Sequence, residues 1–421
     1  MSYKKRLVEE RIKHSLDIIG AIYIRGAKAC GKTETALRYA KSSINLQHDG
    51  RNKLLAHVAP EDVLEGASPR LIDEWQEVPT IWNDVKVAVD SRKSPGQFIL
   101  TGSATLEDSV KLHSGAGRFI RLDMSTMTWR ELGYSNGSVS LTDLLDGKPV
   151  KARQNSVELR RILERLVVGG WPALIGYSEG DAIDVNRAYV DLMLSDDISR
   201  ISGVARDRDK AERVFASLAR NIATPVEVST IATDAISDTF VGSELTVSRQ
   251  ATYGYLDDFS RLMLLVNQPA WSGHIRSSAS LRKTPKRHLV DTSLACASLS
   301  LSSERLYQDL NFAGFLFESL VFHDLSVYAG LNDARLSYYR DSAGKEVDII
   351  VTRRDGAWAA FEVKLGDVDL GQASEKLIAF AENIDTVRTP APSSLNIVTG
   401  TGVAYTREDG VNILPLSVLG V

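Results

Sequence analysis

Eight residues near the amino terminus, GAKACGKT at positions 26–33, restrict the choice of fold more than any other segment of the chain. They fit the pattern G-x-x-x-x-G-K-[ST], in which backbone N–H groups surround phosphate oxygens. The apolar run Ala21–Arg25 precedes this phosphate loop, and Ala36 and Ala40 follow it at helical spacing. Because the loop needs a strand before it and a helix amino terminus after it, the segment predicts an α/β core built on a parallel sheet.

The phosphate loop predicts a site for ATP and Mg²⁺. Lys32 is expected to reach the β- and γ-phosphates, and the Thr33 hydroxyl is expected to coordinate magnesium. The other predicted nucleotide contacts come from the loop and the first turn of the helix, namely Gly26, Ala27, Lys28, Ala29, Cys30, Gly31 and Glu34. An ordinary glycine turn is the alternative, which the flanking strand and helix patterns disfavour.

The stretch LIDEWQEVP at 71–79 begins as a short apolar run and continues with two carboxylates, Asp73 and Glu74. At the end of a strand such a pair can hold magnesium and position an attacking water. Asp73 is therefore the predicted metal ligand, and Glu74 is predicted to orient or deprotonate the water. Two adjacent acids on a solvated surface are the alternative, and the upstream phosphate loop favours the catalytic interpretation.

Two further residues are candidates for the same reaction. Ser103 follows the short apolar run FILT, where its hydroxyl could contact the γ-phosphate, and a simple strand-ending turn is the alternative. Arg118, in GAGR, is predicted to stabilise transition-state charge, either in its own chain or from a neighbouring subunit. The alternative for Arg118 is an ordinary surface arginine.

The length of 421 residues exceeds what one hydrophobic core usually supports, so two or three domains are expected. A content of 43% hydrophobic and 25% charged residues is typical of globular proteins. The net charge of -4 argues against a general basic coat for nonspecific nucleic-acid binding. The two cysteines, Cys30 and Cys296, make neither a disulfide framework nor a zinc set. Residues 1–14 lack an apolar export core, and no segment approaches the roughly 18 apolar residues of a membrane span, which predicts a cytoplasmic protein.

Four segments are predicted along the chain. Residues 1–135 alternate short apolar runs with helical patterns, as in a P-loop core. Residues 136–206 are predicted to be a helical connector, residues 207–284 a second helical domain, and residues 285–421 an α+β domain.

The chain resembles, over nearly its whole length, a family of predicted bacterial and archaeal ATPases of the AAA+ superfamily whose carboxyl-terminal half is called domain of unknown function 4143. The motifs that carry the resemblance are GAKACGKT (26–33), LIDEWQEVP (71–79), FILTGSA (98–104), GAGRF (115–119), GGWPALIG (169–176), TPKRHLVDTSL (284–294), GFLFESLV (314–321) and EVDIIV…FEVK (346–364). The resemblance implies an AAA+ core, a winged-helix-like middle and a restriction-endonuclease-like carboxyl-terminal fold. Ser293 departs from the family, which more often has glycine at that position.

Three short helices are predicted in the middle of the chain, at 214–219, 228–232 and 248–259, and they give a helix-turn-helix outline with Ser248 as the cap of the last helix. The face of that helix predicted to meet a DNA groove carries Arg249, Gln250, Thr252 and Tyr253. A basic cluster follows a loop or wing at 271–284, and it consists of Lys283, Lys286, Arg287 and His288. Packing against protein alone is the alternative, because no dense basic patch accompanies the helices.

The last segment contains Glu318, Asp348, Glu362 and Lys364, which resemble the acid-acid-lysine set of restriction-endonuclease-like folds. In such sites carboxylates hold magnesium against a phosphodiester, and the lysine polarises the attacking water. A fold relic without cleavage activity is the alternative.

The strand register can be derived from the turn between the last two acids. A three-residue turn at 354–356, with Gly356 left-handed, pairs Ile349 with Phe361 and Val351 with Ala359. The apolar face is then continuous, and on the reverse face Asp348 lies opposite Glu362. Two opposed carboxylates repel unless a cation or proton lies between them, which predicts a magnesium or manganese site.

Three functional hypotheses remain at this point. The first is a magnesium-dependent ATPase whose nucleotide state controls the winged-helix-like and nuclease-like regions, acting on DNA or on a protein partner. The second is an ATP-regulated DNA nuclease, and the third is a nucleotide-gated interaction module that does not hydrolyse ATP. No membrane contact is expected, and the sequence leaves a monomer and a homo-oligomer equally open.

Overall fold

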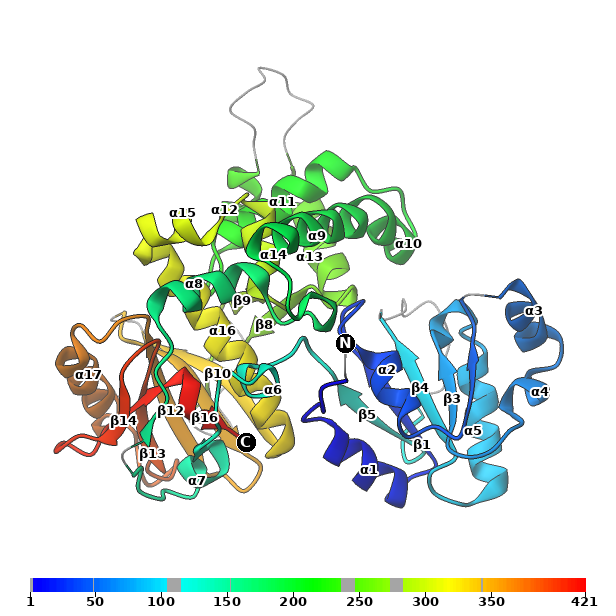
Figure 1. The fold of residues 1–421 in the computed structure, drawn as a ribbon, viewed down its shortest axis with the longest axis horizontal. Helices are drawn as coiled ribbons and strands as arrows, with labels where there is room; N and C mark the ends of the chain where they lie inside the picture. Colours follow the sequence, from blue (N-terminus) through cyan, green and yellow to red (C-terminus); the bar gives the residue numbers. More distant parts are fainter. Residues whose placement is uncertain are drawn as a thin grey trace. The chain divides into compact units, whose positions relative to one another are not determined.

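The computed structural model describes residues 3–47, 49–103, 115–151, 153–235, 247–272, 283–341 and 344–421. The chain divides into two compact units, and each unit has its own sheet (Figure 1). The first unit comprises Met1–Thr126, Asp197–Ala205 and Asp258–Leu264, and the second comprises Met127–Asp196, Arg206–Asp257 and Leu265–Val421. Among the described residues, no helix is long and apolar enough to cross a membrane.

The first unit is built on a five-stranded, fully parallel sheet with the strand order β2-β3-β4-β1-β5. Its strands are β1 (Ala21–Arg25), β2 (Ser42–Asn45), β3 (Arg70–Asp73), β4 (Phe98–Gly102) and β5 (Phe119–Asp123). Its helices are α1 (Glu9–Ile18), α2 (Lys32–Leu37), α3 (Gly50–Val58), α4 (Pro60–Leu64), α5 (Ile81–Arg92), α10 (Ile198–Ser202) and the 3-10 helix η1 (Trp75–Glu77). The predicted parallel sheet and its strand at 21–25 are thereby confirmed.

Continuous apolar runs explain why β1 and β4 lie inside this sheet. Every residue of β4 is buried, as are the first four of β1, which is the pattern of strands covered on both faces. Aromatic rings fill part of the core, where Trp82 stacks on Phe119 with ring centroids 4.1 Å apart. Since the carboxyl ends of parallel strands share one edge, the segments that follow β1, β3 and β4 meet there.

The second unit contains a mixed seven-stranded sheet with the order β10-β11-β12-β13-β15-β14-β7. Its strands are β7 (Arg153–Gln154), β10 (Ala334–Arg340), β11 (Glu346–Arg353), β12 (Trp358–Lys364), β13 (Ser394–Thr399), β14 (Val403–Thr406) and β15 (Asn412–Pro415). The long helix α16 (Leu310–Leu331) packs on β10, β11 and β12, and α17 (Leu370–Glu382) packs on β12 and β13 (Figure 1). Two short pairs, β6 (Val139–Ser140) with β16 (Leu419–Gly420) and β8 (Leu265–Gln268) with β9 (Lys286–Leu289), complete the strands.

The remaining helices of the chain lie mainly between the two large sheets in sequence. They are α6 (Trp129–Leu132), α7 (Leu141–Leu145), α8 (Leu159–Val168), α9 (Glu179–Leu192), α11 (Arg208–Arg220), α12 (Val228–Asp234), α13 (Arg249–Arg261), α14 (Thr292–Ser298) and α15 (Ser303–Gln308), with the short helices η2 (Pro172–Leu174), η3 (Met193–Asp197) and η6 (Leu416–Val418). The three predicted helices of the middle segment correspond to α11, α12 and α13. The predicted cap is present, because the Ser248 hydroxyl accepts the Ala251 N–H at 3.1 Å.

The predicted DNA-facing surface of α13 is wrong at one position. Thr252 is fully buried, and its hydroxyl donates to the Ser248 carbonyl at 3.0 Å. The helical period explains the error, because Thr252 lies one turn before the buried Leu256 and therefore on the same face. Arg249 and Tyr253 are exposed as predicted.

The predicted basic cluster is also wrong as a surface feature. Lys286, Arg287 and His288 are buried in β9, and only Lys283 is exposed. Arg287 donates to the Val226 carbonyl, which ties β9 to the segment between α11 and α12. Most of the predicted wing at 271–284 lies outside the described residues.

The predicted hairpin register is confirmed between β11 and β12. Ile349 pairs with Phe361 and Val351 with Ala359, and Gly356 has a φ of 93°. Ser293, the departure from the family pattern, lies in α14, where its hydroxyl donates to Asp291 at 2.7 Å.

Candidate nucleotide site and charged cluster

The carboxyl edge of the parallel sheet gathers most of the predicted nucleotide-site residues. The phosphate loop follows β1, Asp73 ends β3 and precedes Glu74, and Ser103 follows β4. Because β4 lies between β3 and β1, these three segments are neighbours at one edge.

Carbonyl oxygens of the phosphate loop accept hydrogen bonds from the lysine of the same loop. Lys32 is buried, and its Nζ donates to the carbonyl oxygens of Gly26 at 3.0 Å and Ala27 at 2.9 Å. Gly26 must be glycine, because a Cβ there would lie 1.9 Å from the Met124 carbonyl oxygen. The tight backbone and the enclosed ammonium group fit the binding of a phosphate chain at the start of α2.

Arg6 supports the loop from the amino-terminal segment, and the sequence analysis missed this residue. Its Nη1 donates to the Cys30 carbonyl at 2.7 Å and its Nη2 to the Ser125 carbonyl at 2.8 Å. The side chain is buried although it precedes every recognisable motif, so no sequence pattern marked it.

Asp73 accepts hydrogen bonds from three neighbouring segments. Its Oδ1 accepts from the Thr33 hydroxyl at 2.9 Å and from the Thr101 hydroxyl, and its Oδ2 accepts from Asn45 Nδ2 at 2.7 Å. Thr33 and Asp73 therefore lie together, as the predicted magnesium pair requires. Hydroxyl and carboxylate oxygens suit Mg²⁺, so this donor set fits a magnesium–nucleotide complex.

Asn45 and Thr101 are functional candidates that the sequence analysis overlooked. Each is a polar residue at or near the carboxyl end of an apolar strand, and that position was the available signal. Together with Thr33 they fix the orientation of the Asp73 carboxylate, which is 4% exposed.

Glu74 lies in a left-handed backbone conformation with a φ of 54°. Its Oε2 accepts from the Gln76 side-chain amide, and the Ser103 hydroxyl lies 3.4 Å from the same oxygen. Both predicted residues, Glu74 and Ser103, thus belong to one polar group beside the phosphate loop, and Gln76 is an additional member.

Arg118 lies at the opposite edge of the sheet. Its carbonyl accepts the N–H of Ala21, the first residue of β1, whereas the phosphate loop follows the last residue of that strand. Its guanidinium pairs with Asp90 at 2.7 Å.

Two other predicted nucleotide contacts lie in and after the phosphate loop. Glu34 is exposed in the first turn of α2. Lys28 of the loop pairs with Asp197 at 3.2 Å.

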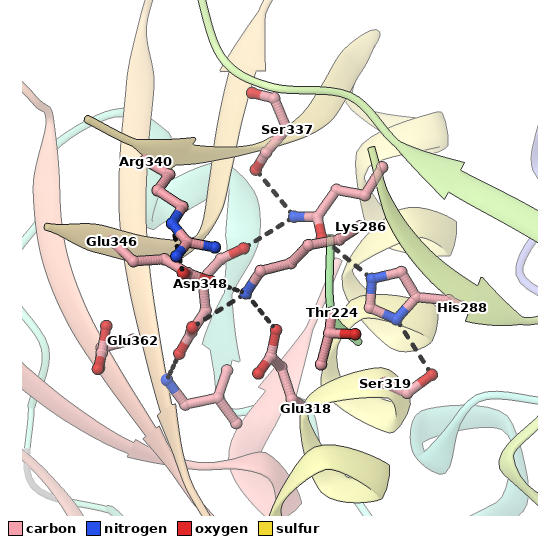
Figure 2. A network of polar contacts seen from close by, with 12 residues as sticks. Thr224, Lys286, His288, Glu318, Ser319, Ser337, Arg340, Glu346, Asp348 and Glu362 are labelled. Carbon is pink, nitrogen blue, oxygen red and sulfur yellow. Dashed lines mark hydrogen bonds and ion pairs between the residues drawn. The ribbon is translucent and has the colours of Figure 1, made fainter. Parts of the chain in front are cut away.

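A second cluster of charged residues surrounds Lys286 in the second unit (Figure 2). The Lys286 Nζ lies 2.8 Å from Glu318, 2.6 Å from Glu346 and 3.3 Å from Asp348. These carboxylates come from α16 and β11, while the lysine comes from β9. The structure therefore brings two of the predicted acids, Glu318 and Asp348, to one cation, which the sequence placed only in a short basic cluster.

Glu362 and Lys364 lie beside this cluster on β12. The Lys364 Nζ donates to Glu362 at 2.8 Å, and Asp348 accepts the Val363 N–H at 2.9 Å. Among the residues that the structure describes, no three His, Cys, Asp or Glu side chains are spaced to hold a metal ion directly. The acids are arranged around the two lysines instead.

Burial and mutual repulsion shift the protonation of these acids. Burial, followed by the nearby Asp348 carboxylate, raises the pKa of Glu318 to about 8 and that of Glu362 to about 7. Burial alone would lower the pKa of Lys286, but Asp348, Glu318 and Glu346 outweigh it and raise that pKa, so the lysine is charged. Glu318 and Glu362 therefore keep a proton at a higher pH than ordinary glutamates do, while Lys286 stays charged.

Three family models match parts of the chain. Residues 20–133 match the AAA domain, residues 159–305 match a domain of unknown function (DUF8612), and residues 313–419 match a domain of unknown function (DUF4143). With its phosphate loop and parallel sheet, the chain is a P-loop protein of the AAA class. The resemblance noted in the sequence is confirmed for these two parts of the chain, which match an AAA domain at 20–133 and a DUF4143 domain at 313–419.

Individual relatives are distant. Uncharacterized proteins of Mycobacterium bovis and Mycobacterium tuberculosis are each 24% identical over 373 residues, which cover 86% of this chain and 74% of theirs. A Walker-type ATPase of Pyrococcus abyssi superposes with a TM-score of 0.42 at 12% identity, covering 70% of this chain and 96% of that one.

Proposed function

We propose that this protein is a magnesium-dependent ATPase whose nucleotide state controls its second unit. The observation that carries the proposal is the hydrogen bond from the hydroxyl of Thr33, the last residue of the phosphate loop, to the Asp73 carboxylate, with Glu74 next in the chain. Binding of a magnesium nucleotide needs Thr33 and Asp73, and activation of the attacking water needs Glu74.

Each residue has a distinct task in this mechanism. Lys32 exchanges its loop carbonyls for β- and γ-phosphate oxygens, and Thr33 and Asp73 hold the metal when it is bound. Glu74 orients the attacking water and accepts its proton as the water oxygen bonds to the γ-phosphorus, while the bond from that phosphorus to the β–γ bridging oxygen breaks and ADP leaves. Gln76 and Ser103 hold the Glu74 carboxylate in place.

Lys28 supports the link between nucleotide state and the rest of the chain. This loop residue pairs with Asp197 at 3.2 Å, in the segment that joins α9 to α11. A nucleotide that draws Lys28 towards its phosphates weakens this ion pair, and the segment can then change position.

Nucleotide binding and phosphate release, measured for four proteins, test the proposal. Lys32→Ala is expected to lose most nucleotide affinity, whereas Glu74→Gln should bind normally and release phosphate at least about a hundredfold more slowly. The matched control is Glu77→Gln, because Glu77 lies on the same segment but pairs with Lys53 at 2.6 Å, and it should behave as wild type. Equal losses of affinity in both site variants would contradict the assigned roles. Tight ATP binding without phosphate release in the wild type would instead establish the non-hydrolysing interaction module.

A second candidate function, an ATP-regulated DNA nuclease, is favoured by the charged cluster of the second unit. Asp348 lies close enough to raise the pKa of Glu362, and Lys364 donates to Glu362, so the acids and the lysine share one region of the sheet. With a divalent ion bound, this donor set could hold a phosphodiester for attack by water. Magnesium-dependent DNA cleavage that Glu362→Ala abolishes and ATP modulates would support this function, and DNA cleavage that persists unchanged in Glu362→Ala would contradict it.

DNA contact through the middle segment is proposed on narrower grounds. The order of α11, α12, α13 and the β8–β9 pair is that of a winged helix, and Arg249 and Tyr253 are exposed on α13. Arg249→Ala should weaken DNA binding and reduce its salt dependence. Unchanged DNA affinity would favour the alternative, in which this face contacts a protein partner.

A further inference from the structure

Lys286 occupies the centre of the charged cluster. It lies on β9, whereas the acids that it contacts lie on α16 and β11. The side chain is 2% exposed and extends from β9 to Glu318 on α16 and to Glu346 and Asp348 on β11 (Figure 2). Its ammonium group is the only positive charge that contacts Glu318 among the ion pairs of the described residues. Several carboxylates that lie this close together in a buried site need a compensating cation. Here Lys286 supplies it.

Further contacts dock the β8–β9 pair beside the same acids. Gln268 on β8 donates through Nε2 to the Asp348 carbonyl at 2.8 Å and to the Ser337 carbonyl at 3.0 Å. His288 on β9 lies 3.0 Å from Gln268 Oε1 and 3.1 Å from the Ser319 hydroxyl on α16 (Figure 2). This polar network fixes β9, the strand that carries Lys286. Lys286 leaves the cluster when β9 shifts or when the Lys286 side chain changes its conformation.

A lysine ammonium and a divalent ion compete for the same carboxylate oxygens. A metal ion that binds Glu318 and Asp348 takes oxygens that now face Lys286, and two cations in one small space repel each other. This competition accounts for the observation that the acids, as they stand, are spaced around an ammonium group rather than around a metal ion.

We propose that Lys286 is a resident cation that keeps the nuclease-like cluster closed to divalent metal until it is withdrawn. The inference rests on the second candidate function, since it concerns the regulation of that site. Metal binding is then coupled to the β8–β9 pair, so any partner that moves β9 opens the cluster. We call this arrangement the lock. It depends on the charge of Lys286 and on the ion pair between Lys286 and Glu346, and Glu346 is not one of the predicted metal ligands.

Manganese binding to the full-length protein, followed by electron paramagnetic resonance of free Mn²⁺, tests the lock. In the wild type, Lys286 should hold Mn²⁺ affinity low. Lys286→Met keeps an unbranched side chain that is one atom shorter and removes the charge, and this variant should bind one Mn²⁺ per chain at least about tenfold more tightly. Glu362→Gln, combined with Lys286→Met, should abolish that binding.

A second variant keeps the test decisive if Lys286→Met does not fold. Glu346→Gln weakens the hold on Lys286 and leaves Glu318, Asp348 and Glu362 unchanged, and Glu346 is partly exposed, so the fold should tolerate it. It should also raise Mn²⁺ affinity. Glu304→Gln, which removes only a surface contact with Arg160, is the matched control and should bind Mn²⁺ as the wild type does.

The outcomes separate the lock from the function on which it rests. Wild-type binding as tight as that of both variants, lost with Glu362→Gln, would overturn the lock but leave the metal site. No binding in the wild type, Lys286→Met or Glu346→Gln would end the metal site and the lock together. Tighter binding in either variant, reversed by Glu362→Gln, would support both.

Discussion

At the scale of single residues, Asp73 carries two roles that can be separated by mutation. Its carboxylate accepts from Thr33, Thr101 and Asn45 while it is almost fully buried. Asp73→Ala leaves these donors without their acceptor, and we expect it to lower the free energy of unfolding by about 1–3 kcal/mol. Urea denaturation monitored by circular dichroism measures this loss.

Asp73→Asn is the control for the structural role. An amide oxygen can still accept from the two threonines, so most of the stability should remain, while the charge that attracts magnesium is lost. We therefore expect near-normal unfolding with strongly reduced phosphate release. If Asp73→Asn released phosphate at the wild-type rate, Asp73 would not be the metal ligand.

Single residues also show where sequence reasoning stopped. Lys32, Thr33 and Asp73 could be predicted because a phosphate loop and an acid-ended strand have local spacings that chemistry dictates. Lys286 could not, because a lysine in a short basic stretch is usually exposed, and its burial depends on acids supplied by α16 and β11. Tertiary contacts decided its environment.

At the scale of elements, the β11–β12 hairpin shows how far local rules reach. Its register followed from two requirements, a continuous apolar face and a left-handed glycine in the turn, and both are met. The same rules could not place the β8–β9 pair. Its two strands are separated in sequence by residues 269–285, and their polar side chains contact β11 and α16. Pairing of distant strands leaves no short-range signal in the sequence.

The hairpin turn gives a prediction at this scale. Gly356 has a φ of 93°, where a side chain is strained, so Gly356→Ala should lower the free energy of unfolding by about 1–2 kcal/mol. Gly371→Ala is the control, because Gly371 lies in α17 with open space around its Cβ position, and alanine favours helix there. Thermal denaturation compares the two, and equal stabilities would show that the turn does not need a left-handed residue.

At the scale of the whole molecule, the two units interleave along the sequence. Segments 197–205 and 258–264 belong to the first unit although residues of the second unit flank them on both sides. The predicted boundaries at 135, 206 and 284 rest on composition and periodicity, which report local structure and not the return of the chain to an earlier unit. Those boundaries remain predictions, and the phosphate loop and the charged cluster belong to different units.

The placement of Arg118 makes assembly testable. Arg118 lies at the amino edge of the parallel sheet, and β1 separates it from the phosphate loop by roughly 13–16 Å, the length of five strand residues. An arginine at that edge cannot stabilise charge at its own phosphate loop, so a catalytic Arg118 must serve a neighbouring subunit. Its ion pair with Asp90 would have to open when subunits meet.

If Arg118 acts on a neighbouring subunit, phosphate release per chain should rise with protein concentration, because only assembled chains have a complete site. Arg118→Ala should reduce turnover by about a thousandfold, a loss that arginines of this kind produce when removed. Mixing Arg118→Ala chains with wild-type chains should lower turnover more than dilution with buffer does, since each variant chain deprives a neighbour. Arg121→Ala, which removes an exposed arginine from β5, the strand that follows Arg118, should have no such effect. Turnover that is independent of concentration, together with equal activities of the two arginine variants, would show that Arg118 has only a surface role.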